Sequence, residues 1–304
     1  MMAIQWFPGH MHVARKKVAE TLAKVDVVIE IVDARMPLSS SNPMIEKLRM
    51  HRQRPALKIL NKADLADPTL NKVWLEWFRA QPGTEAILLG EDNKQEALKK
   101  IPQLCLKLAP FRTGVEKPLR AMIMGIPNVG KSTLLNTLAQ RKVAKVADTP
   151  GVTKSQQRIE TLGGVILYDT PGLMWPKVEH EPSGFRLALG GSIGRNAYDE
   201  VEVAYFAIEA LKARYPAELM KRYKLPDLNG EVEELFERIG RKRGAVMSGG
   251  IIDEQKTADL IITDYRTKAI GRMTLETPDD FIGVDLGSGD DLAESDVADS
   301  EEAQ

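Results

Sequence analysis

The stretch LRAMIMGIPNVGKSTLLNTL, residues 119–138, decides the fold because it joins an apolar strand to a helix through a glycine-rich turn. Gly125, Gly130, Lys131 and Ser132 fit the pattern G-x-x-x-x-G-K-[ST] without a mismatch. In that pattern backbone N–H groups surround phosphates, the lysine reaches the β and γ phosphates, and the hydroxyl binds Mg²⁺. The alternative is a glycine turn that carries a lysine by accident, and the flanking strand and helix argue against it.

A second stretch, VILYDTPG at residues 165–172, contains groups that usually accompany a phosphate loop. Asp169 ends an apolar strand, where its carboxylate can hold the Mg²⁺ shell, and the Gly172 N–H can meet the γ-phosphate. Another DTPG, at residues 148–151, follows no apolar strand. We interpret that copy as a turn leading to Thr153, whose hydroxyl is expected to close on Mg²⁺. Taken alone, either DTPG is also compatible with a simple turn.

The stretch KILNKADLAD, residues 58–67, is typical of a loop that reads a guanine base, and it follows an apolar strand. Asn61 and Lys62 are expected to pack on the ring, and Asp64 to accept from the guanine N1–H and the exocyclic amine. Adenine lacks that donor pair. The base loop here precedes the phosphate loop, the reverse of the ordinary order. A parallel sheet gathers its loops at one edge, so the reversed order can keep the same site.

Strands and helices alternate along the first 180 residues, which predicts a doubly wound, mostly parallel α/β sheet. Strands are expected in VDVVIEIVDA, ALKIL, EAILL, LRAMIMG, QQRIETL and GGVILYDT, with helices at residues 10–24, 43–50, 68–79 and 94–108. Residues 109–118 lack a period and are interpreted as a linker. VDVVIEIVDA is a nearly continuous apolar run, as expected for a strand that is covered on both faces.

Three regions are predicted: a nucleotide-binding domain at residues 1–180, a small helical domain at 181–280 and an acidic, disordered tail at 281–304. In the middle region apolar side chains recur at helical spacing, with Asn229 as a cap and Gly240 as a stop for one helix. The tail holds eight of the 43 acidic residues and no basic one, which leaves 35 acidic against 42 basic residues before it, a charge of +7. That balance suits a nucleic-acid partner.

The composition indicates a soluble, cytoplasmic protein. The start of the chain lacks the basic and apolar regions of a secretory signal, and no apolar run approaches the roughly 20 residues that span a bilayer. Cys105 is the single cysteine, so the chain can form no internal disulfide, and its apolar surroundings favour a buried thiol.

The motifs together resemble the circularly permuted GTPases of the YlqF/RbgA type, which are bacterial ribosome-assembly factors. The resemblance covers roughly residues 4–280. It is carried by WFPGHM at 6–11, DARMPLSSSNP at 33–43, NKAD at 61–64, GIPNVGKSTLLN at 125–136, TPGVTK at 149–154 and YDTPGL at 168–173. The sequence departs from the family in one loop, where Leu89-Gly90-Glu91 replaces a short polar motif near the guanine.

The resemblance implies a GTP-hydrolysing assembly factor of the large (50S) ribosomal subunit, and we expect it to bind rRNA in a nucleotide-dependent way. We also expect Mg²⁺ as a cofactor and a monomer away from the ribosome. It implies that His10 is catalytic, beside Lys131 and Thr153, because Leu173 stands where many GTPases place a water-orienting glutamine. It also implies that Asn128 coordinates K⁺. The remaining expected nucleotide contacts are Ala63, Leu89, Gly90, Val129 and Thr133.

Three alternatives stay open at this point. The first is a GTP-dependent scaffold or switch with little hydrolysis and a different RNA or protein partner, which Leu173 allows. The second is an NTPase without an RNA partner, although no second substrate motif is visible. The third concerns His10 alone, which could simply cap the following helix.

Overall fold

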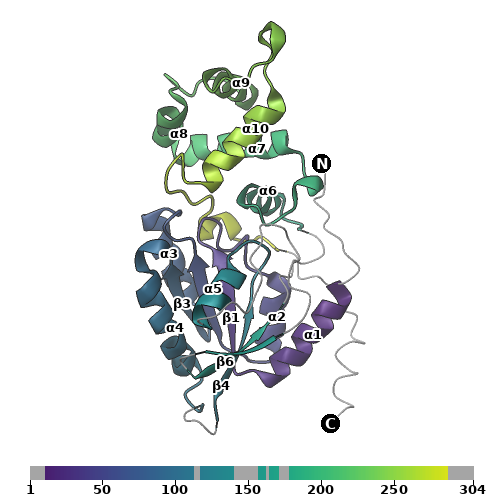
Figure 1. Cartoon of the computed structure of the whole chain (residues 1–304), viewed down its shortest axis with the longest axis vertical. Coiled ribbons are helices and arrows are strands. Elements are labelled where there is room, and N and C mark those ends of the chain that lie inside the picture. The colour runs from purple at the N-terminus through teal and green to yellow at the C-terminus, as the bar shows by residue number, and fades with distance from the viewer. Residues whose placement is uncertain (1–10, 113–116, 140–156, 162–163, 171–177, 287–304) are drawn as a thin grey trace.

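The computed structural model describes residues 11–112, 117–139, 157–161, 164–170 and 178–286. Strands and helices alternate through the first half of the chain, as predicted (Figure 1). The elements are α1 Met11–Lys24, β1 Val27–Asp33, α2 Pro43–His51, β2 Ala56–Asn61, α3 Pro68–Arg79, β3 Thr84–Leu89, α4 Lys94–Leu108, β4 Leu119–Met124, α5 Lys131–Leu138, β5 Gln157–Glu160 and β6 Val165–Asp169.

These strands form one six-stranded sheet with the order β3-β2-β1-β4-β6-β5. Every neighbouring pair is parallel except β5 with β6. The prediction of a mostly parallel sheet is therefore confirmed. Strand β4, which leads into the phosphate loop, lies beside β1, and β2, which leads into the base loop, lies on the other side of β1. Because these strands run parallel, their following loops meet at one edge of the sheet.

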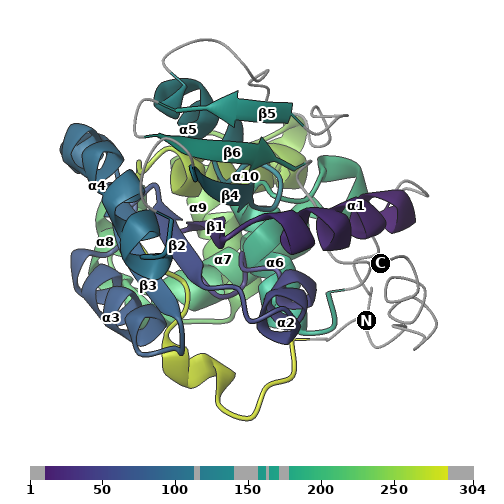
Figure 2. The ribbon, with the colours of Figure 1, turned by 90° about the horizontal axis from the view of Figure 1, so that it is seen from below.

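Helices cover both faces of the sheet, which explains the apolar run of β1 (Figure 2). Ile29 and Ile31 pack in one cluster with residues of α4 and α5. Val28 points the other way and packs with residues of α1 and α2, while Val32 packs with α3. The strand is thus buried on both sides, as its sequence predicts.

The Cys105 thiol is buried in the cluster that contains Ile29 and Ile31, and burial raises its pKa to about 12.

One buried ion pair interrupts this apolar interior. Glu30 of β1 lies directly opposite Lys58 of β2, and the two side chains pair while almost fully buried. Ser41 Oγ and the Asn42 N–H also donate to the Glu30 carboxylate. Burial would lower the pKa of Lys58, but Glu30 and Glu46 outweigh that effect and raise it. A charged pair with satisfied hydrogen bonds therefore occupies a position that the sequence pattern marks as apolar.

The described chain after β6 forms helices without a further sheet strand, apart from one isolated bridge between Val246 and Ile252. The helices are α6 Glu181–Gly190, α7 Glu200–Arg214, α8 Pro216–Tyr223, α9 Val232–Lys242 and α10 Glu254–Arg266. Most of their predicted apolar faces are buried in a cluster distinct from those of the sheet, and Ala210 and Val232 are half-buried against it. We call residues 178–270 the helical region.

The predicted ends of α9 are wrong. Glu231, not Asn229, is the N-cap, and the helix continues through Gly240 to Lys242. Gly240 has a packing role instead, because an added Cβ would lie 2.7 Å from Thr257 Oγ1 of α10. The glycine therefore allows close contact between two helices rather than ending one of them.

After α10 the chain turns back to the sheet and runs along its loop edge (Figures 1 and 2). Residues 271–276, which we call the return strap, lie against the loops that follow β1 and β2. Met273 N donates to Leu65 O at 3.0 Å, and Leu275 N donates to Arg35 O at 2.8 Å. The helical region is thus connected to the sheet at both of its ends.

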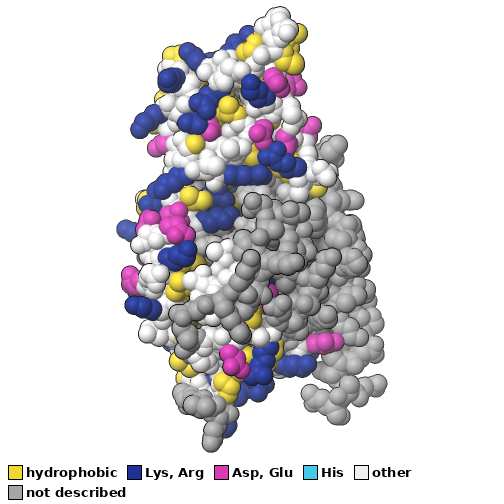
Figure 3. Space-filling model, viewed as in Figure 1, with side chains coloured by type: hydrophobic (Ala, Val, Ile, Leu, Met, Phe, Trp, Pro, Cys, Tyr) yellow, Lys and Arg dark blue, Asp and Glu magenta, His cyan; other side chains and the backbone are white. Residues whose placement is uncertain are grey.

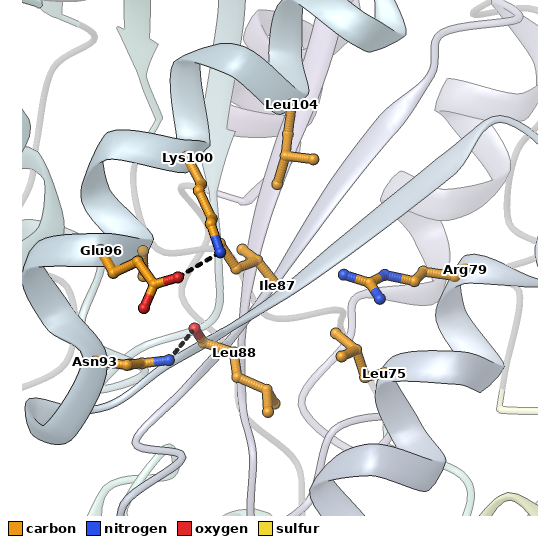
Figure 4. A pocket seen from close by; sticks show the side chains of 9 residues that line it. Leu75, Arg79, Ile87, Leu88, Asn93, Glu96, Lys100 and Leu104 are labelled. Carbon is orange, nitrogen blue, oxygen red and sulfur yellow. Dashed lines mark hydrogen bonds and ion pairs between the residues drawn. The ribbon is translucent and has the colours of Figure 1, made fainter.

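A shallow groove of about 180 Å³ lies beside the edge strand β3, between α3 and α4 (Figure 4). Two side chains cover the outward carbonyls of that strand. Arg79 donates to Ala86 O at 2.9 Å, and Asn93 Nδ2 donates to Leu88 O at 3.0 Å. Such capping blocks the pairing of an edge strand with another chain.

In the ranges that the structure describes, no helix is long and apolar enough to cross a membrane.

Candidate guanine-nucleotide site

The phosphate loop adopts a backbone path that only glycine allows at two points. A Cβ on Gly125 would lie 2.8 Å from Ile31 O, and a Cβ on Gly130 would lie 2.2 Å from Asn61 Nδ2. Gly130 also has a φ of 99°, in the left-handed region. Helix α5 begins directly afterwards, so Lys131, Ser132 and Thr133 form its first turn. The free N–H groups and the dipole of that turn favour an anion.

Lys131 and Asp169 meet at the bottom of this loop. Lys131 Nζ lies 2.5 Å from Asp169 Oδ1, and both side chains are buried. Burial raises the pKa of Asp169, although Lys131 opposes the rise. Asp169 Oδ2 is buried and has no hydrogen-bond partner among the described residues. A buried carboxylate oxygen beside the N-terminus of α5 fits the oxygen ligands of Mg²⁺.

The base loop and the phosphate loop are bonded to each other. Asn61 Nδ2 donates to Val129 O at 2.6 Å, and Lys62 Nζ donates to Asn128 O at 2.9 Å. Lys62 and Asn128 both have a positive φ, of 61° and 63°, which turns each loop sharply at the point of contact. Two motifs that are separated by more than 60 residues in the sequence are thereby brought to one place.

Sequence reasoning gave no role to the acid that holds Lys62. Asp33, at the end of β1, accepts from Lys62 Nζ at 2.9 Å and from Arg35 Nη2 at 2.7 Å. Burial would raise the pKa of Asp33, but Arg35 and Lys62 outweigh it and hold the pKa well below its ordinary value. Burial also lowers the pKa of Lys62. The sequence does show an Asp at the end of a buried strand, on the same edge of the sheet as NKAD.

Asp64 lies against the loop that follows β3. The Ala63 N–H donates to Leu89 O at 3.0 Å, and the Glu91 N–H donates to Asp64 Oδ1 at 3.2 Å. A Cβ on Gly90 would lie 2.8 Å from the Asp64 nitrogen, so glycine permits this approach. The structure therefore places Leu89 and Gly90 beside the proposed guanine-reading carboxylate.

Asn128 connects the phosphate loop with the helical region. Its Nδ2 donates to Gly191 O at 2.7 Å, at the C-terminal end of α6. Arg266 of α10 holds the neighbouring carbonyls of Ala188 and Leu189. Three further residues of the predicted site, His10, Thr153 and Gly172, lie outside the described residues, as does Leu173.

Comparison with known proteins gives a consistent result. A sequence model of the 50S ribosome-binding GTPases matches residues 120–242, beginning inside β4. The chain is 44% identical over 287 residues to ribosome biogenesis GTPase A of Bacillus cereus, covering 92% of this chain and 96% of the relative. It is 30% identical over 277 residues to mitochondrial ribosome-associated GTPase 1 of Xenopus tropicalis, covering 87% and 88% of the two chains.

Solved structures agree. The crystal structure of GNP-bound YlqF from Thermotoga maritima aligns with a TM-score of 0.63 at 26% identity, over 88% of this chain and 98% of that one. The GDP-bound structure of the same protein aligns with a TM-score of 0.61 at 25% identity, over 86% and 99%.

The parallel sheet, the phosphate loop and the base loop that precedes it define a GTPase with a circularly permuted G domain. The chain belongs to the ribosome biogenesis GTPase A family, also called RbgA or YlqF. It therefore binds guanine nucleotides and hydrolyses GTP, and the alternative of a scaffold with little hydrolysis is not favoured.

Proposed function

We propose that residues 61–64 and 125–133 form a single guanine-nucleotide site. The observation that carries this proposal is the pair of hydrogen bonds from Asn61 and Lys62 to the carbonyls of the phosphate loop. In this site Asp64 accepts from the guanine N1–H and amine, while Asn61 and Lys62 flank the ring. Leu89 and Gly90 contribute backbone groups beside the base, and Ala63 and Val129 contribute the loop backbone.

The phosphates lie over the first turn of α5 in this proposal. Lys131 contacts the β and γ phosphates, with backbone N–H groups from Asn128 to Thr133 around them. Ser132, Asp169 and Thr153 hold Mg²⁺ or its water shell, and the unpartnered Asp169 oxygen supports this assignment. Bound there, Mg²⁺ supplies positive charge to the β and γ oxygens. The Gly172 N–H faces the γ-phosphate.

Hydrolysis is assigned to His10, which orients the attacking water, because Leu173 offers no side-chain hydrogen bond for that purpose. Asn128 coordinates K⁺ through its side-chain oxygen. The Nδ2 bond to Gly191 O supports that role, because it fixes the plane of the amide.

The partner proposed for this GTPase is the large ribosomal subunit in assembly, bound through rRNA by a helical domain at residues 181–280. The relatives are named as ribosome biogenesis and ribosome-associated GTPases. Several basic side chains of this region are engaged internally, since Arg195, Arg214 and Arg222 pair with acids. Others remain exposed on it, among them Lys221, Lys242 and Arg243, and basic side chains recur over its visible face (Figure 3). We propose that this activity takes place in the cytoplasm. We also propose that the acidic tail at 281–304 does not contact the RNA.

Co-sedimentation with purified large subunits tests this proposal. Binding should weaken steeply as salt rises, because phosphate contacts release counterions. Changing Arg241, Lys242 and Arg243 together to alanine should weaken binding and leave intrinsic GTP hydrolysis intact. Changing the exposed Lys72, Lys99 and Lys100 on α3 and α4 to alanine removes the same charge elsewhere and should have little effect. If binding changes neither with salt nor in the variant that lacks Arg241, Lys242 and Arg243, the proposed RNA surface is wrong.

A further inference from the structure

The return strap bonds to the base loop at successive residues. Arg272 Nη2 donates to Ala63 O at 3.0 Å, and its Nε donates to Ala66 O at 3.0 Å. The next residue, Met273, donates its N–H to Leu65 O at 3.0 Å. Three carbonyls of the loop that carries NKAD are therefore held by a segment some 200 residues later in the chain.

The strap itself is anchored firmly. Met273, Thr274 and Leu275 are buried, and Glu276 accepts from the N–H groups of Leu38 and Ser39 while fully buried. The indole of Trp74 donates to Glu276 O at 3.1 Å. A segment fixed at so many points can position what it touches.

The strap is also tied to the helical region. The Tyr215 hydroxyl, between α7 and α8, accepts from Thr274 N at 3.0 Å and lies 3.2 Å from Asp67 Oδ2. Burial raises the pKa of Tyr215 to about 12, so the hydroxyl keeps its proton at neutral pH. Asp67 caps α3, the helix that follows the base loop. This hydroxyl of the helical region therefore contacts both the strap and the end of the base loop.

We propose that Arg272 is a positioning residue for guanine recognition, acting through the backbone of the base loop. The proposal rests on the assignment of Asp64 as the guanine-reading carboxylate. Asp64 follows Ala63 directly, and the Ala63 carbonyl accepts from Arg272 Nη2 and from Asn71 Nδ2. The guanidinium therefore helps to fix where the next side chain starts. The planar fork of an arginine spans two carbonyls with fixed geometry, which a lysine ammonium cannot do. The structural alternative is that Arg272 merely adds stability.

Nucleotide titration of the full-length chain separates these two roles. GDP and inosine diphosphate are the probes, because inosine lacks the exocyclic amine that Asp64 accepts from. Arg272→Ala should weaken GDP binding by about tenfold, which is roughly 1.4 kcal/mol, and should reduce the preference for GDP over inosine diphosphate. Arg272→Lys should lie between Arg272→Ala and the wild type.

Arg238→Ala is the matched control, because Arg238 donates to the carbonyls of Asn229 and Asp227 inside the helical region. It should lower the melting temperature without changing the preference between the two nucleotides. If Arg272→Ala aggregates, Arg272→Lys and Tyr215→Phe serve as the test variants. Tyr215→Phe removes one hydroxyl and should cause a smaller loss of GDP affinity and of the preference for GDP.

Unchanged GDP affinity and unchanged preference in Arg272→Lys and Arg272→Ala would overturn the positioning role. A wild-type chain that does not distinguish GDP from inosine diphosphate would instead contradict the assignment of Asp64. The two failures are therefore distinguishable.

Discussion

Gly90 shows how a single missing side chain shapes the site. The residue follows β3, and its φ of −141° is open to any amino acid. Glycine is required there for space alone, because a Cβ would lie 2.8 Å from the Asp64 nitrogen and 3.0 Å from Asp64 Oδ1. The small size of residue 90 therefore permits the observed position of Asp64, the proposed guanine-reading carboxylate.

Gly90→Ala should weaken guanine-nucleotide binding by roughly tenfold, or about 1.4 kcal/mol, because the Asp64 side chain must move to make room. Titration with a fluorescent GDP analogue measures this loss, and a thermal melt shows whether the fold is intact. If the Gly90→Ala protein binds GDP as tightly as the wild type, residue 90 lies away from the base.

Asp33 makes folding stability depend on pH. Its pKa is depressed in the folded state, so its contribution is fully present above the ordinary Asp value of about 3.9 and is lost as pH falls toward the folded pKa. Asp33→Asn removes the charge that pairs with Arg35 and Lys62, and should cost roughly 3–5 kcal/mol at pH 7. Urea unfolding followed by circular dichroism measures the difference.

That difference should shrink below about pH 4, because Asp33 takes up a proton there in the unfolded chain while it stays ionised in the folded protein. A gap between wild type and variant that stays constant from about pH 7 to about pH 3 would contradict the charge pairing. Loss of nucleotide affinity is expected alongside, because Asp33 holds Lys62.

The site residues that the sequence suggests are those whose expected role is local. Gly130, Lys131 and Asp64 belong to short motifs in which spacing alone determines the geometry. The contact of Asp33 with Lys62 and the contacts of Arg272 were missed because the tertiary fold sets these partners. Arg272 donates to a carbonyl 209 positions away, and its surroundings in the sequence give no sign of it.

At the scale of the element, the predicted strands and helices followed from periodicity, and the errors came from packing. Gly240 fits the pattern of a helix stop, yet α9 continues through it to Lys242. A glycine stands inside this helix because Thr257 of α10 approaches it closely, and no pattern within α9 can reveal that contact. Likewise the Glu30–Lys58 pair could not be predicted from either strand alone, because its two members come from different strands of mostly apolar sequence.

Gly240→Ala provides a test of this packing. Alanine favours a helix by about 1 kcal/mol over glycine, but its Cβ would lie 2.7 Å from Thr257 Oγ1. The clash should prevail and lower the free energy of unfolding by roughly 1–3 kcal/mol. Repeating the change in a Thr257→Ala background should reduce the penalty. A stabilised Gly240→Ala protein would show that the two helices are not in close contact.

At the scale of the whole molecule, the reversed order of motifs changes what is attached to the site. The sheet still gathers the base loop and the phosphate loop at one edge, so the proposed nucleotide site is compatible with the permutation. The helical region begins after β6, near the phosphate loop, and ends in a strap on the base loop. The helical region contacts the phosphate loop through Gly191, and the strap that follows it contacts the base loop.

The central claim is that two halves of the chain, in reversed order, make one guanine site. Calorimetric titration of the full-length protein with GTP, ATP and xanthosine triphosphate, for wild type and Asp64→Asn, tests it most directly. The wild type should prefer GTP to ATP by a wide margin. Asp64→Asn, in the first half, should shift the preference to xanthosine triphosphate, whose donor pattern is inverted, while the phosphate loop of the second half still binds. Equal binding of GTP and ATP by the wild type, or an unchanged preference in the variant, would contradict the claim.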